Sequence, residues 1–341
     1  MIEKNEAGQR MDKYLKKYFK EAGSGFLYKM LRKKNILLND KKAEGNEILK
    51  LGDTVTLYLA EETIEKFRGI SKTNKQIKQK YPVVPLDIIY EDSDFIMLNK
   101  PAGMLSQKAS DQDVSLVEYL IGYLQSQGKI TDRELETFHP SVCNRLDRNT
   151  SGLILAGKTL SGLQFLSAML KERSMKKYYL CLVRGQVIEK KHCKAYLKKD
   201  TKTNQVQVMN HQVKGSSVIE TAYEPLWRGK KETLLKVELI TGKSHQIRCH
   251  LASLGYPLAG DPKYGDPNWN RELKKKAGLS RQFLHAWQTV FPEMEGTGAA
   301  LSNKTICAPL PKDLTETLKA VGCDRESGKK ADYGKRTGNE E

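Results

Sequence analysis

The sequence lacks the apolar segments that membrane insertion and secretion require. No run of about 18 apolar residues, the length of a membrane-spanning helix, occurs in the 341 residues. The opening, MIEKNE, has no hydrophobic stretch of the kind found in signal peptides. We therefore expect a cytoplasmic protein that neither crosses a membrane nor carries a secretion signal.

Closely spaced cysteines are also missing. The six cysteines, at positions 143, 181, 193, 249, 307 and 323, form no C-x-x-C pair. Zinc sites and dithiol redox centres depend on such spacing, and disulfide frameworks belong to shorter, secreted chains. His139, His245 and His250 also lack metal-site spacing with other ligands. These features predict reduced thiols and no metal ion.

Acidic residues are too few to balance the basic ones. The chain has 58 Lys and Arg against 41 Asp and Glu, a formal net charge of +17. A surplus of this size attracts polyanions, so it indicates nucleic acid as the first partner to consider. The length exceeds what one hydrophobic core usually fills, so we expect two domains.

Residues 1–62 are predicted to form a small α/β unit. Apolar residues at helical spacing predict a helix over 9–20 and a second after Ser24, with strands at 36–38 and 55–59 around a turn at 39–40. Four cations lie on or just after the second helix: Lys29, Arg32, Lys33 and Lys34. From charge alone, an RNA-binding surface and an ordinary solvated face are equally good interpretations.

The next segment is predicted to be a linker. Between residues 66 and 80 there are six Lys or Arg and no acidic residue, and residues 63–84 show little periodicity. This composition predicts a flexible tether that adds salt-sensitive phosphate contacts in a complex. Residues 323–341 are polar and are predicted to be a disordered tail.

Residues 85–322 carry the patterns of a larger α+β domain. Several strand patterns follow one another without a helix between them, which favours a mixed, largely antiparallel sheet flanked by helices. Strands are predicted at 87–90, 95–98, 152–156, 178–183, 205–209, 218–223, 234–240 and 283–291, and helices at 116–124, 160–170 and 245–254.

One motif imitates a nucleotide-binding loop. Residues 152–159, GLILAGKT, satisfy the pattern G-x-x-x-x-G-K-[ST]. In such a loop the middle residues form a turn around a phosphate, whereas here they are an apolar run typical of a buried strand. We interpret the match as chance and keep a P-loop nucleotidase as an alternative.

A polar stretch, residues 139–152, leads into that apolar run. Within it, Asp147 lies between Arg145 and Arg148. A salt-bridged turn is the simpler interpretation, because structural ion pairs outnumber catalytic ones. The alternative is a nucleophilic carboxylate that neighbouring cations keep ionised.

Five ordered blocks resemble one enzyme family. Residues 145–155, RLDRNTSGLIL, are similar to the signature of the RluA/RluD family of RNA pseudouridine synthases. Four further blocks agree in order: IIYEDSDFIMLNKPAGM, KYYLCLVRG, TGKSHQIRCHLASLGYPLAGDPKYG and FLHAWQTVF. Residues 1–62 resemble the alpha-L RNA-binding module named after ribosomal protein S-four. Asn144 departs from the family, which usually has His there.

The resemblance implies a pseudouridine synthase fold and an isomerase that needs no cofactor. It implies that Asp147 is the nucleophile, that Tyr179 stacks on the target base and that Arg248 pairs with Asp147. It places Arg145 in the space that the flipped uridine leaves. It also implies that the exposed basic helix of the N-terminal module binds RNA phosphates. Because strand side chains alternate between faces, only one of Tyr178 and Tyr179 can be the active-site tyrosine.

Other functions stay open at this point. The basic charge and the extra module favour large-subunit ribosomal RNA over transfer RNA as the substrate, and we expect a monomer. A non-catalytic RNA-binding or ribosome-assembly factor is the main alternative, although it would not need all three of Asp147, Tyr179 and Arg248. A glycosidase would require a second catalytic carboxylate, and none stands out.

Overall fold

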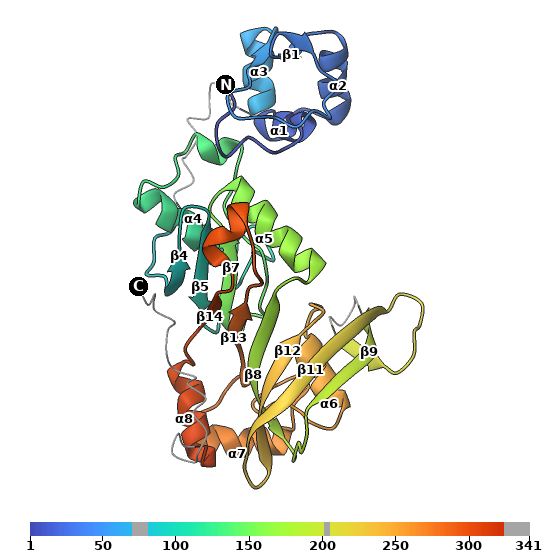
Figure 1. The fold of residues 1–341 in the computed structure, drawn as a ribbon, viewed down its shortest axis with the longest axis vertical. Helices are drawn as coiled ribbons and strands as arrows, with labels where there is room; N and C mark the ends of the chain where they lie inside the picture. The colour runs from blue at the N-terminus through green and yellow to red at the C-terminus, as the bar shows by residue number, and fades with distance from the viewer. Residues whose placement is uncertain (70–80, 201–204, 324–341) are drawn as a thin grey trace.

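The structure is a computed structural model that describes residues 1–69, 81–200 and 205–323. Its N-terminal unit folds around a small core to which both of the first two helices contribute (Figure 1). The elements of this unit are α1 (Met11–Tyr18), α2 (Ser24–Arg32), β1 (Ile36–Leu38), β2 (Lys41–Lys42), β3 (Val55–Leu57) and α3 (Glu61–Arg68). The three strands form an antiparallel sheet in the order β2-β1-β3.

The helix α3 corrects the predicted linker. Residues 63–84 were expected to lack periodicity, but α3 runs to Arg68 and ends at Gly69, whose left-handed backbone closes it. Ile64 and Phe67, three residues apart, pack on the core of the N-terminal unit, and the Phe67 and Phe26 ring centroids lie 4.3 Å apart. The Lys and Arg residues around Ile64 and Phe67 obscured this apolar face of the helix in the sequence. The rest of the basic segment, residues 70–80, lies outside the described residues, as does the predicted tail beyond Cys323.

Smaller differences concern ends of elements. Ser24 is the first residue of α2, not its cap, because Gly23 occupies the capping position and no side chain bonds there. The last strand of the unit ends at Leu57, two residues before the predicted end. The turn at Asn39 and Asp40 is present, and both residues have positive φ angles.

The larger domain is built on one sheet of 11 strands among the described residues. Its order is β10-β9-β11-β12-β8-β13-β7-β5-β4, with β14 beside β13 and β6 beside β7. Of these pairings, β13 with β7 is parallel and the others are antiparallel. The predicted α+β class with a mixed, largely antiparallel sheet is confirmed.

The elements of this domain run along the chain in the following order. They are β4 (Ile88–Glu91), β5 (Phe95–Lys100), α4 (Leu116–Ser126), η1 (Glu134–Glu136), β6 (Ser141–Val142), β7 (Ser151–Gly157), α5 (Leu160–Glu172), β8 (Lys176–Arg184), β9 (Lys191–Asp200), β10 (Gln205–Met209), β11 (Ser217–Arg228), β12 (Glu232–Leu239), α6 (Gln246–Ser253), α7 (Pro267–Ala277), β13 (Leu284–Val290), η2 (Gly296–Leu301), β14 (Thr305–Cys307) and α8 (Lys312–Val321).

Each predicted strand and helix of this domain is present, but the sequence did not predict β6, β9, β14, α7, α8 or the short helices η1 and η2. In β9, Cys193, Ala195 and Leu197 are buried in alternation, a strand pattern that the intervening lysines obscured. The helices α7 and α8 carry the ordinary signals: Asp266 caps α7 before Pro267, and glycines with positive φ end both helices.

Strands β5 and β7 separate two cores. Ile96 and Ile154 belong to the core that includes residues of α4, whereas Phe95 and Leu155 belong to the core that includes residues of α5. Because side chains of a strand alternate between faces, a strand covered on both faces must be apolar throughout. This explains the continuous apolar sequence of β7, all of whose seven residues are buried.

The nucleotide-binding interpretation of residues 152–159 is therefore wrong. The supposed loop is the buried strand β7. Lys158 pairs with Glu91 at 2.7 Å, and the Thr159 side chain caps α5 by accepting a hydrogen bond from Gly162 N. Lys158 and Thr159, the side chains that would bind phosphate and metal in a P-loop, instead bond to other secondary-structure elements or cap a helix.

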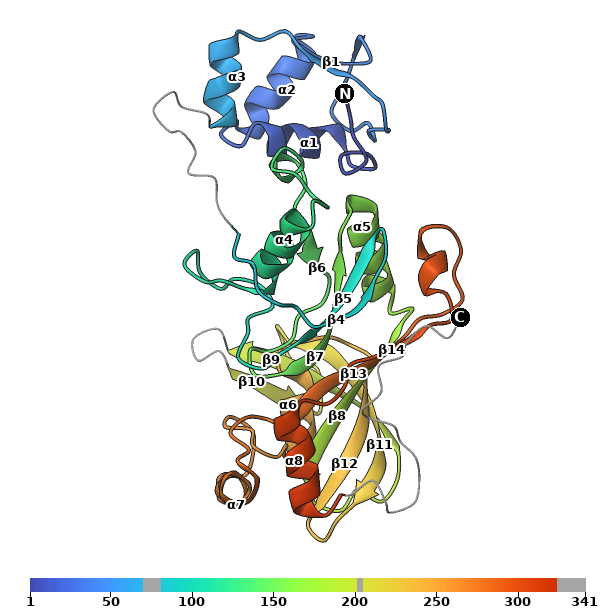
Figure 2. The same ribbon diagram turned by 90° about the vertical axis from the view of Figure 1, so that its left-hand side faces the viewer.

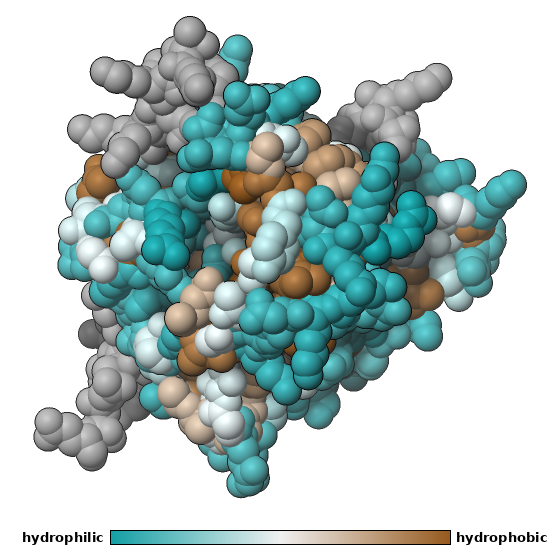
Figure 3. All heavy atoms as spheres, turned by 90° about the horizontal axis from the view of Figure 1, so that it is seen from above, coloured by the Kyte–Doolittle hydropathy of each residue, from teal (hydrophilic) through white to brown (hydrophobic). Residues whose placement is uncertain are grey.

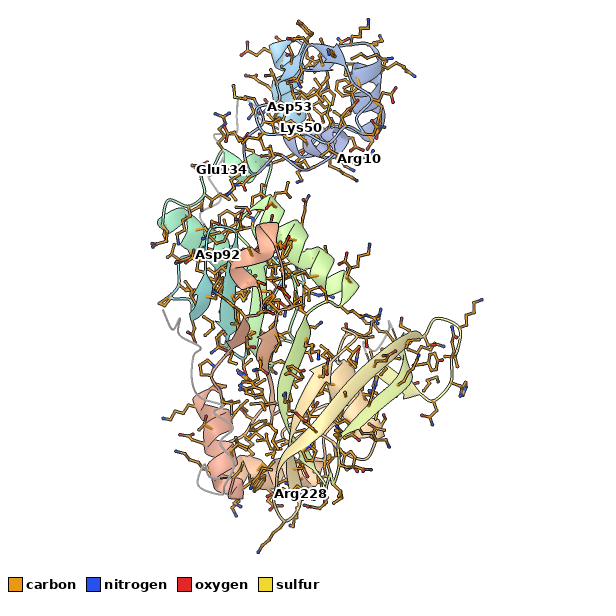
Figure 4. All side chains as sticks on the ribbon, viewed as in Figure 1. Arg10, Lys50, Asp53, Asp92, Glu134 and Arg228 are labelled. Carbon is orange, nitrogen blue, oxygen red and sulfur yellow. The ribbon has the colours of Figure 1, made fainter. Side chains whose placement is uncertain are left out.

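The N-terminal unit lies at one end of the long molecule, next to the segment that contains η1 (Figures 1 and 2). Glu134, labelled in Figure 4, accepts a hydrogen bond from Asn5 at 3.0 Å, and Arg68 pairs with Glu136 at 2.7 Å. Seen from this end, hydrophilic side chains predominate on the surface (Figure 3). Within the described ranges, no helix is both long and apolar enough to cross a membrane.

Candidate active site

Asp147 lies on the loop between β6 and β7, and the loop after β5 holds it through two residues, Ser106 and Gly103. Ser106 Oγ donates to Leu146 O at 2.9 Å and accepts from Leu146 N at 3.0 Å. Gly103 and Arg148 exchange two hydrogen bonds, one from Gly103 N to the Arg148 carbonyl and one from Arg148 Nε to the Gly103 carbonyl. The residue before Asp147 and the residue after it are thus both fixed.

Asn144, which stands where the resembling family has His, binds the neighbouring strand. Its Nδ2 donates to the Leu153 carbonyl at 3.3 Å, and its Oδ1 accepts from Leu155 N at 2.7 Å. An amide carries both the donor and the acceptor that this pair of contacts needs. The Asn side chain therefore anchors the start of the Asp147 loop to β7.

Arg248, on α6, meets Asp147 directly. Its Nη1 donates to Asp147 Oδ2 at 2.9 Å, while its Nε and Nη2 donate to Asp261 at 2.7 and 2.8 Å. Burial alone would lower the pKa of this guanidinium, but the bonds and charges of Asp261 and Asp147 outweigh burial and raise that pKa. Arg248 is thus a permanent cation against the Asp147 carboxylate, whose side chain is 25% exposed.

Tyr179, on β8, lines the same cavity as Asp147. Its side chain is buried, and burial, followed by the charge of Asp147, raises the pKa of its phenol. The phenol is therefore neutral at physiological pH. The neighbouring Tyr178 contacts Lys236 instead, and the Lys236 ammonium lies 4.3 Å from the centroid of the Tyr178 ring.

A cavity of about 60 Å³ opens beside Asp147. Among its lining residues are Arg145, Tyr179, His245 and Arg248. Arg145 is exposed, and its side chain makes no hydrogen bond or ion pair with the described part of the chain. The structure thus brings Asp147, Tyr179, Arg248 and Arg145 together from three separate stretches of sequence.

The remaining predicted RNA-binding residues lie elsewhere. Lys29 and Arg32 are on α2, and Lys33 and Lys34 follow it, all four exposed on the N-terminal unit. None of the four makes an ion pair within the described ranges. They form an unpaired basic surface that is separate from the cavity.

Lys100 was not singled out from the sequence, although it interrupts an apolar run. It is completely buried, and its Nζ donates to the carbonyls of Pro101, Met104 and Arg148 at 2.8, 2.9 and 3.1 Å. Burial, and then the charge of Arg281, lower the pKa of Lys100 to about 7, although Asp147 opposes this shift. The ammonium joins the loop after β5 to the loop that carries Asp147.

The sequence also did not indicate how His245 is placed. The predicted helix was to include it, but α6 begins one residue later and His245 is its N-cap, with a left-handed φ of 55°. Its Nε2 lies 4.0 Å from Asp147 Oδ2, and its Nδ1 lies 3.0 Å from the hydroxyl of Tyr264. Tyr264 follows Asp261 by three residues, so one loop supports both Arg248 and His245, the two side chains that face Asp147. Residues 241–265 already resembled the family, but nothing in that block gave Asp261 or Tyr264 a partner.

Comparison with known proteins gives one consistent result. Residues 94–253 match the RNA pseudouridylate synthase family. The chain is 32% identical to the ribosomal large subunit pseudouridine synthase C of Pasteurella multocida (strain Pm70), over 94% of this chain and 92% of that protein. For the protein of the same name from Escherichia coli (strain K12), the identity is 32%, over 94% and 95%.

Solved structures agree on the fold. Human RNA pseudouridylate synthase domain containing 4 superposes with a TM-score of 0.54 at 21% identity, over 69% of this chain and 92% of that chain. Human RNA pseudouridylate synthase domain containing 1 gives a TM-score of 0.51 at 21% identity, over 67% and 84%. At this identity the likeness shows a shared fold.

Proposed function

The chain belongs to the RNA pseudouridylate synthase family, and from this premise we propose that it isomerises specific uridines of large-subunit ribosomal RNA to pseudouridine. The names of its relatives support this RNA as the substrate. The observation that carries the proposal is the Asp147 carboxylate, held at 2.9 Å by Arg248 in a cavity that Tyr179 also lines.

In this proposal Asp147 acts on the sugar of the target uridine. It either attacks C1′ or assists formation of a glycal, and the bond between C1′ and the uracil N1 breaks. The detached base turns and its C5 joins C1′, after which C5 loses its proton and N1 gains one. A carboxylate can do this only when it is aimed at C1′, and the contact with the buried Arg248 cation fixes its orientation.

Tyr179 is proposed to stack on the target base. Its ring is part of the cavity wall, and its raised pKa keeps the phenol neutral. A neutral aromatic ring can pack against an uncharged base without a desolvated charge between them. Because the phenol is neutral, it is a weak acceptor for the C5 proton.

The RNA has to be gripped and the uridine extruded. We propose that the N-terminal unit is an alpha-L module that contacts phosphates through Lys29, Arg32, Lys33 and Lys34. Extruding a base from paired RNA costs a few kcal/mol. Arg145, exposed at the cavity and two residues before Asp147, is proposed to fill the vacated space.

We further propose that the protein acts as a cytoplasmic monomer without a cofactor or a metal ion. The isomerisation breaks one bond to C1′ and forms another, with no net oxidation or hydrolysis. The reaction therefore calls for acid–base and nucleophilic groups, which side chains supply.

The test uses the purified chain and an unmodified transcript of large-subunit ribosomal RNA. We expect pseudouridine, mapped by its carbodiimide adducts, at a small number of positions. Asp147→Asn should abolish conversion and leave RNA affinity nearly unchanged, because the amide is isosteric but not nucleophilic. Conversion by the Asp147→Asn variant, or no conversion by the wild type of either ribosomal or transfer RNA, would contradict the proposal.

A further inference from the structure

His245 combines an unusual backbone with a side chain aimed at the nucleophile. Its φ of 55° and ψ of 14° lie in the left-handed region, which residues other than glycine adopt uncommonly. Such a conformation persists where neighbouring contacts enforce it, and it is concentrated at functional sites. Here the next residue, Gln246, enforces it, because its buried side chain bonds Thr241, Lys243 N, the Glu220 carbonyl and Thr221.

The imidazole is oriented from the side away from Asp147. Tyr264 Oη lies 3.0 Å from His245 Nδ1 and also accepts a hydrogen bond from Val206 N at 3.4 Å. Since that amide provides a donor to the hydroxyl oxygen, the hydroxyl hydrogen is free for Nδ1. Nδ1 is then the acceptor, and the neutral ring carries its proton on Nε2.

The charges around the ring support the same tautomer. Nε2 lies 4.0 Å from Asp147 Oδ2, and an N–H is attracted to a carboxylate whereas a lone pair would be repelled. Burial, together with Arg248 and Lys263, keeps the pKa of His245 below its ordinary value, although Asp147 and Asp261 act in the opposite direction. The ring is therefore a neutral hydrogen-bond donor at physiological pH.

Among the residues that the structure describes, the N–H of Nε2 has no partner at bonding distance. A separation of 4.0 Å is too long for a hydrogen bond to Asp147, and the side chain, 19% exposed, lines the cavity. Asp147 acts at C1′ in the proposed reaction. Apart from the ring oxygen O4′, the oxygens of a bound uridine nearest to that carbon are the ribose 2′-hydroxyl and the uracil carbonyl oxygen O2, and either of these two can accept a hydrogen bond.

We propose that His245 is a further substrate-contacting residue. Its Nε2–H donates a hydrogen bond to one of two oxygens of the target uridine, the uracil O2 or the ribose 2′-hydroxyl. Tyr264 is the positioning residue that fixes the tautomer of His245. This rests on the proposed uridine isomerisation. A donor at O2 would stabilise the negative charge that develops on the base as the bond to C1′ breaks, and a donor at the 2′-hydroxyl would hold the sugar in position. No proton is transferred by His245 in this step.

Three variants separate this role from a structural one. In His245→Asn the amide can keep the contact at the Nδ1 position, and Asn tolerates the left-handed backbone, but no donor remains at the Nε2 position. In His245→Gln the amide nitrogen reaches the Nε2 position. Tyr264→Phe keeps the ring, whose centroid lies 5.3 Å from the Arg248 guanidinium carbon, and removes only the hydroxyl.

We expect kcat to fall about 10-fold or more in His245→Asn and to return to within about threefold of wild type in His245→Gln. The kcat of Tyr264→Phe should lie between those of His245→Asn and His245→Gln. The RNA affinity of all three variants should stay within about twofold of wild type. His192→Asn is the control, because this His is 60% exposed on β9 and 3.6 Å from Glu220. Equal kcat for wild type and His245→Asn, or equal losses in the Asn and Gln variants, would overturn the proposal.

A second substrate identifies the acceptor. A synthetic RNA carries 2-thiouridine at the mapped position, so that sulfur, a weak acceptor, replaces O2. If O2 is the acceptor, the His245→Asn penalty disappears on this RNA, whereas a full penalty assigns the contact to the 2′-hydroxyl. Failure of the wild type to form pseudouridine on the unmodified RNA would overturn the proposed function itself. An active wild type together with a wild-type kcat in the His245 variants would overturn only the role of His245.

Discussion

Asp261 accepts two hydrogen bonds from the guanidinium of Arg248, at 2.7 and 2.8 Å. The same guanidinium also donates a hydrogen bond to Asp147 at 2.9 Å. The side chain of Asp261 is 0% exposed and that of Arg248 is 7% exposed, so this pair has little room to move. A carboxylate on another loop thereby sets the direction from which Arg248 meets Asp147.

Asp261→Asn should slow the reaction without weakening RNA binding. The variant keeps the volume of the side chain but removes the charge that orients Arg248. We expect a fall in kcat of about 10-fold or more in single-turnover assays at saturating RNA. Thermal unfolding should also begin earlier, since losing one partner of a buried ion pair costs about 3–5 kcal/mol.

The surface pair of Lys236 and Glu224, 3.3 Å apart, provides the control. Glu224→Gln removes an ion pair whose acid is 48% exposed, and such pairs contribute about 0–1 kcal/mol. Its kcat should equal that of the wild type. A wild-type kcat in Asp261→Asn would show that Arg248 needs no second anchor.

The sequence was sufficient for most of the elements but not for the contacts between them. Strand β7 could be predicted from its unbroken apolar run, and α4 from its helical spacing, because both patterns are local. The Asp261–Arg248 pair joins the loop before α7 to α6, and Arg248 meets Asp147 from 101 residues away. No local pattern encodes such pairings, since they arise when the sheet aligns distant segments.

Helix α3 shows the opposite difficulty. Its pattern is local, yet Lys66 and Arg68 flank the Phe67 side chain that the core needs, so the charges concealed the apolar face. Lysine and arginine are tolerated there because a helix exposes most of its circumference to solvent. For residues 63–68, the basic composition was thus a poor sign of a linker.

Lys100→Met should change how stability depends on pH. The pKa of Lys100 is about 7 in the folded chain, below its ordinary 10.5, so between these values the unfolded chain binds more protons. The free energy of unfolding therefore gains a contribution that rises with pH from about 7 to about 10.5. Lys100→Met removes this contribution and flattens the curve.

Chemical denaturation at pH 7 and pH 9 measures the difference. The comparison concerns the slope with pH, because the variant also removes three hydrogen bonds to carbonyl oxygens and is less stable at every pH. Lys312→Met, at a side chain that is 89% exposed on α8, is the control for the loss of one lysine and should leave the slope unchanged. Identical slopes for wild type and Lys100→Met would mean that Lys100 titrates normally in the fold.

Replacing two cations of the N-terminal unit should weaken RNA binding at low salt. Lys29 and Lys33 are exposed and unpaired within the described residues, so their loss removes phosphate contacts and little else. In Lys29→Ala/Lys33→Ala, the slope of log affinity against log salt should decrease by about 1–2. The Lys312→Ala/Lys319→Ala pair on α8 removes the same charge and should leave the slope unchanged. Equal slopes for the two double variants would place the RNA away from α2.

Arg145→Ala should matter most where the target uridine is paired. If Arg145 fills the space left by the base, its loss penalises extrusion from a helix and spares a uridine that is already unstacked. We expect kcat/KM to fall about 10-fold further on a hairpin RNA than on a single-stranded RNA with the same flanking sequence. Lys243→Ala removes another exposed cation from the same cavity and should affect both RNAs equally. Equal losses for Arg145→Ala on the two RNAs would reduce its role to an ordinary phosphate contact.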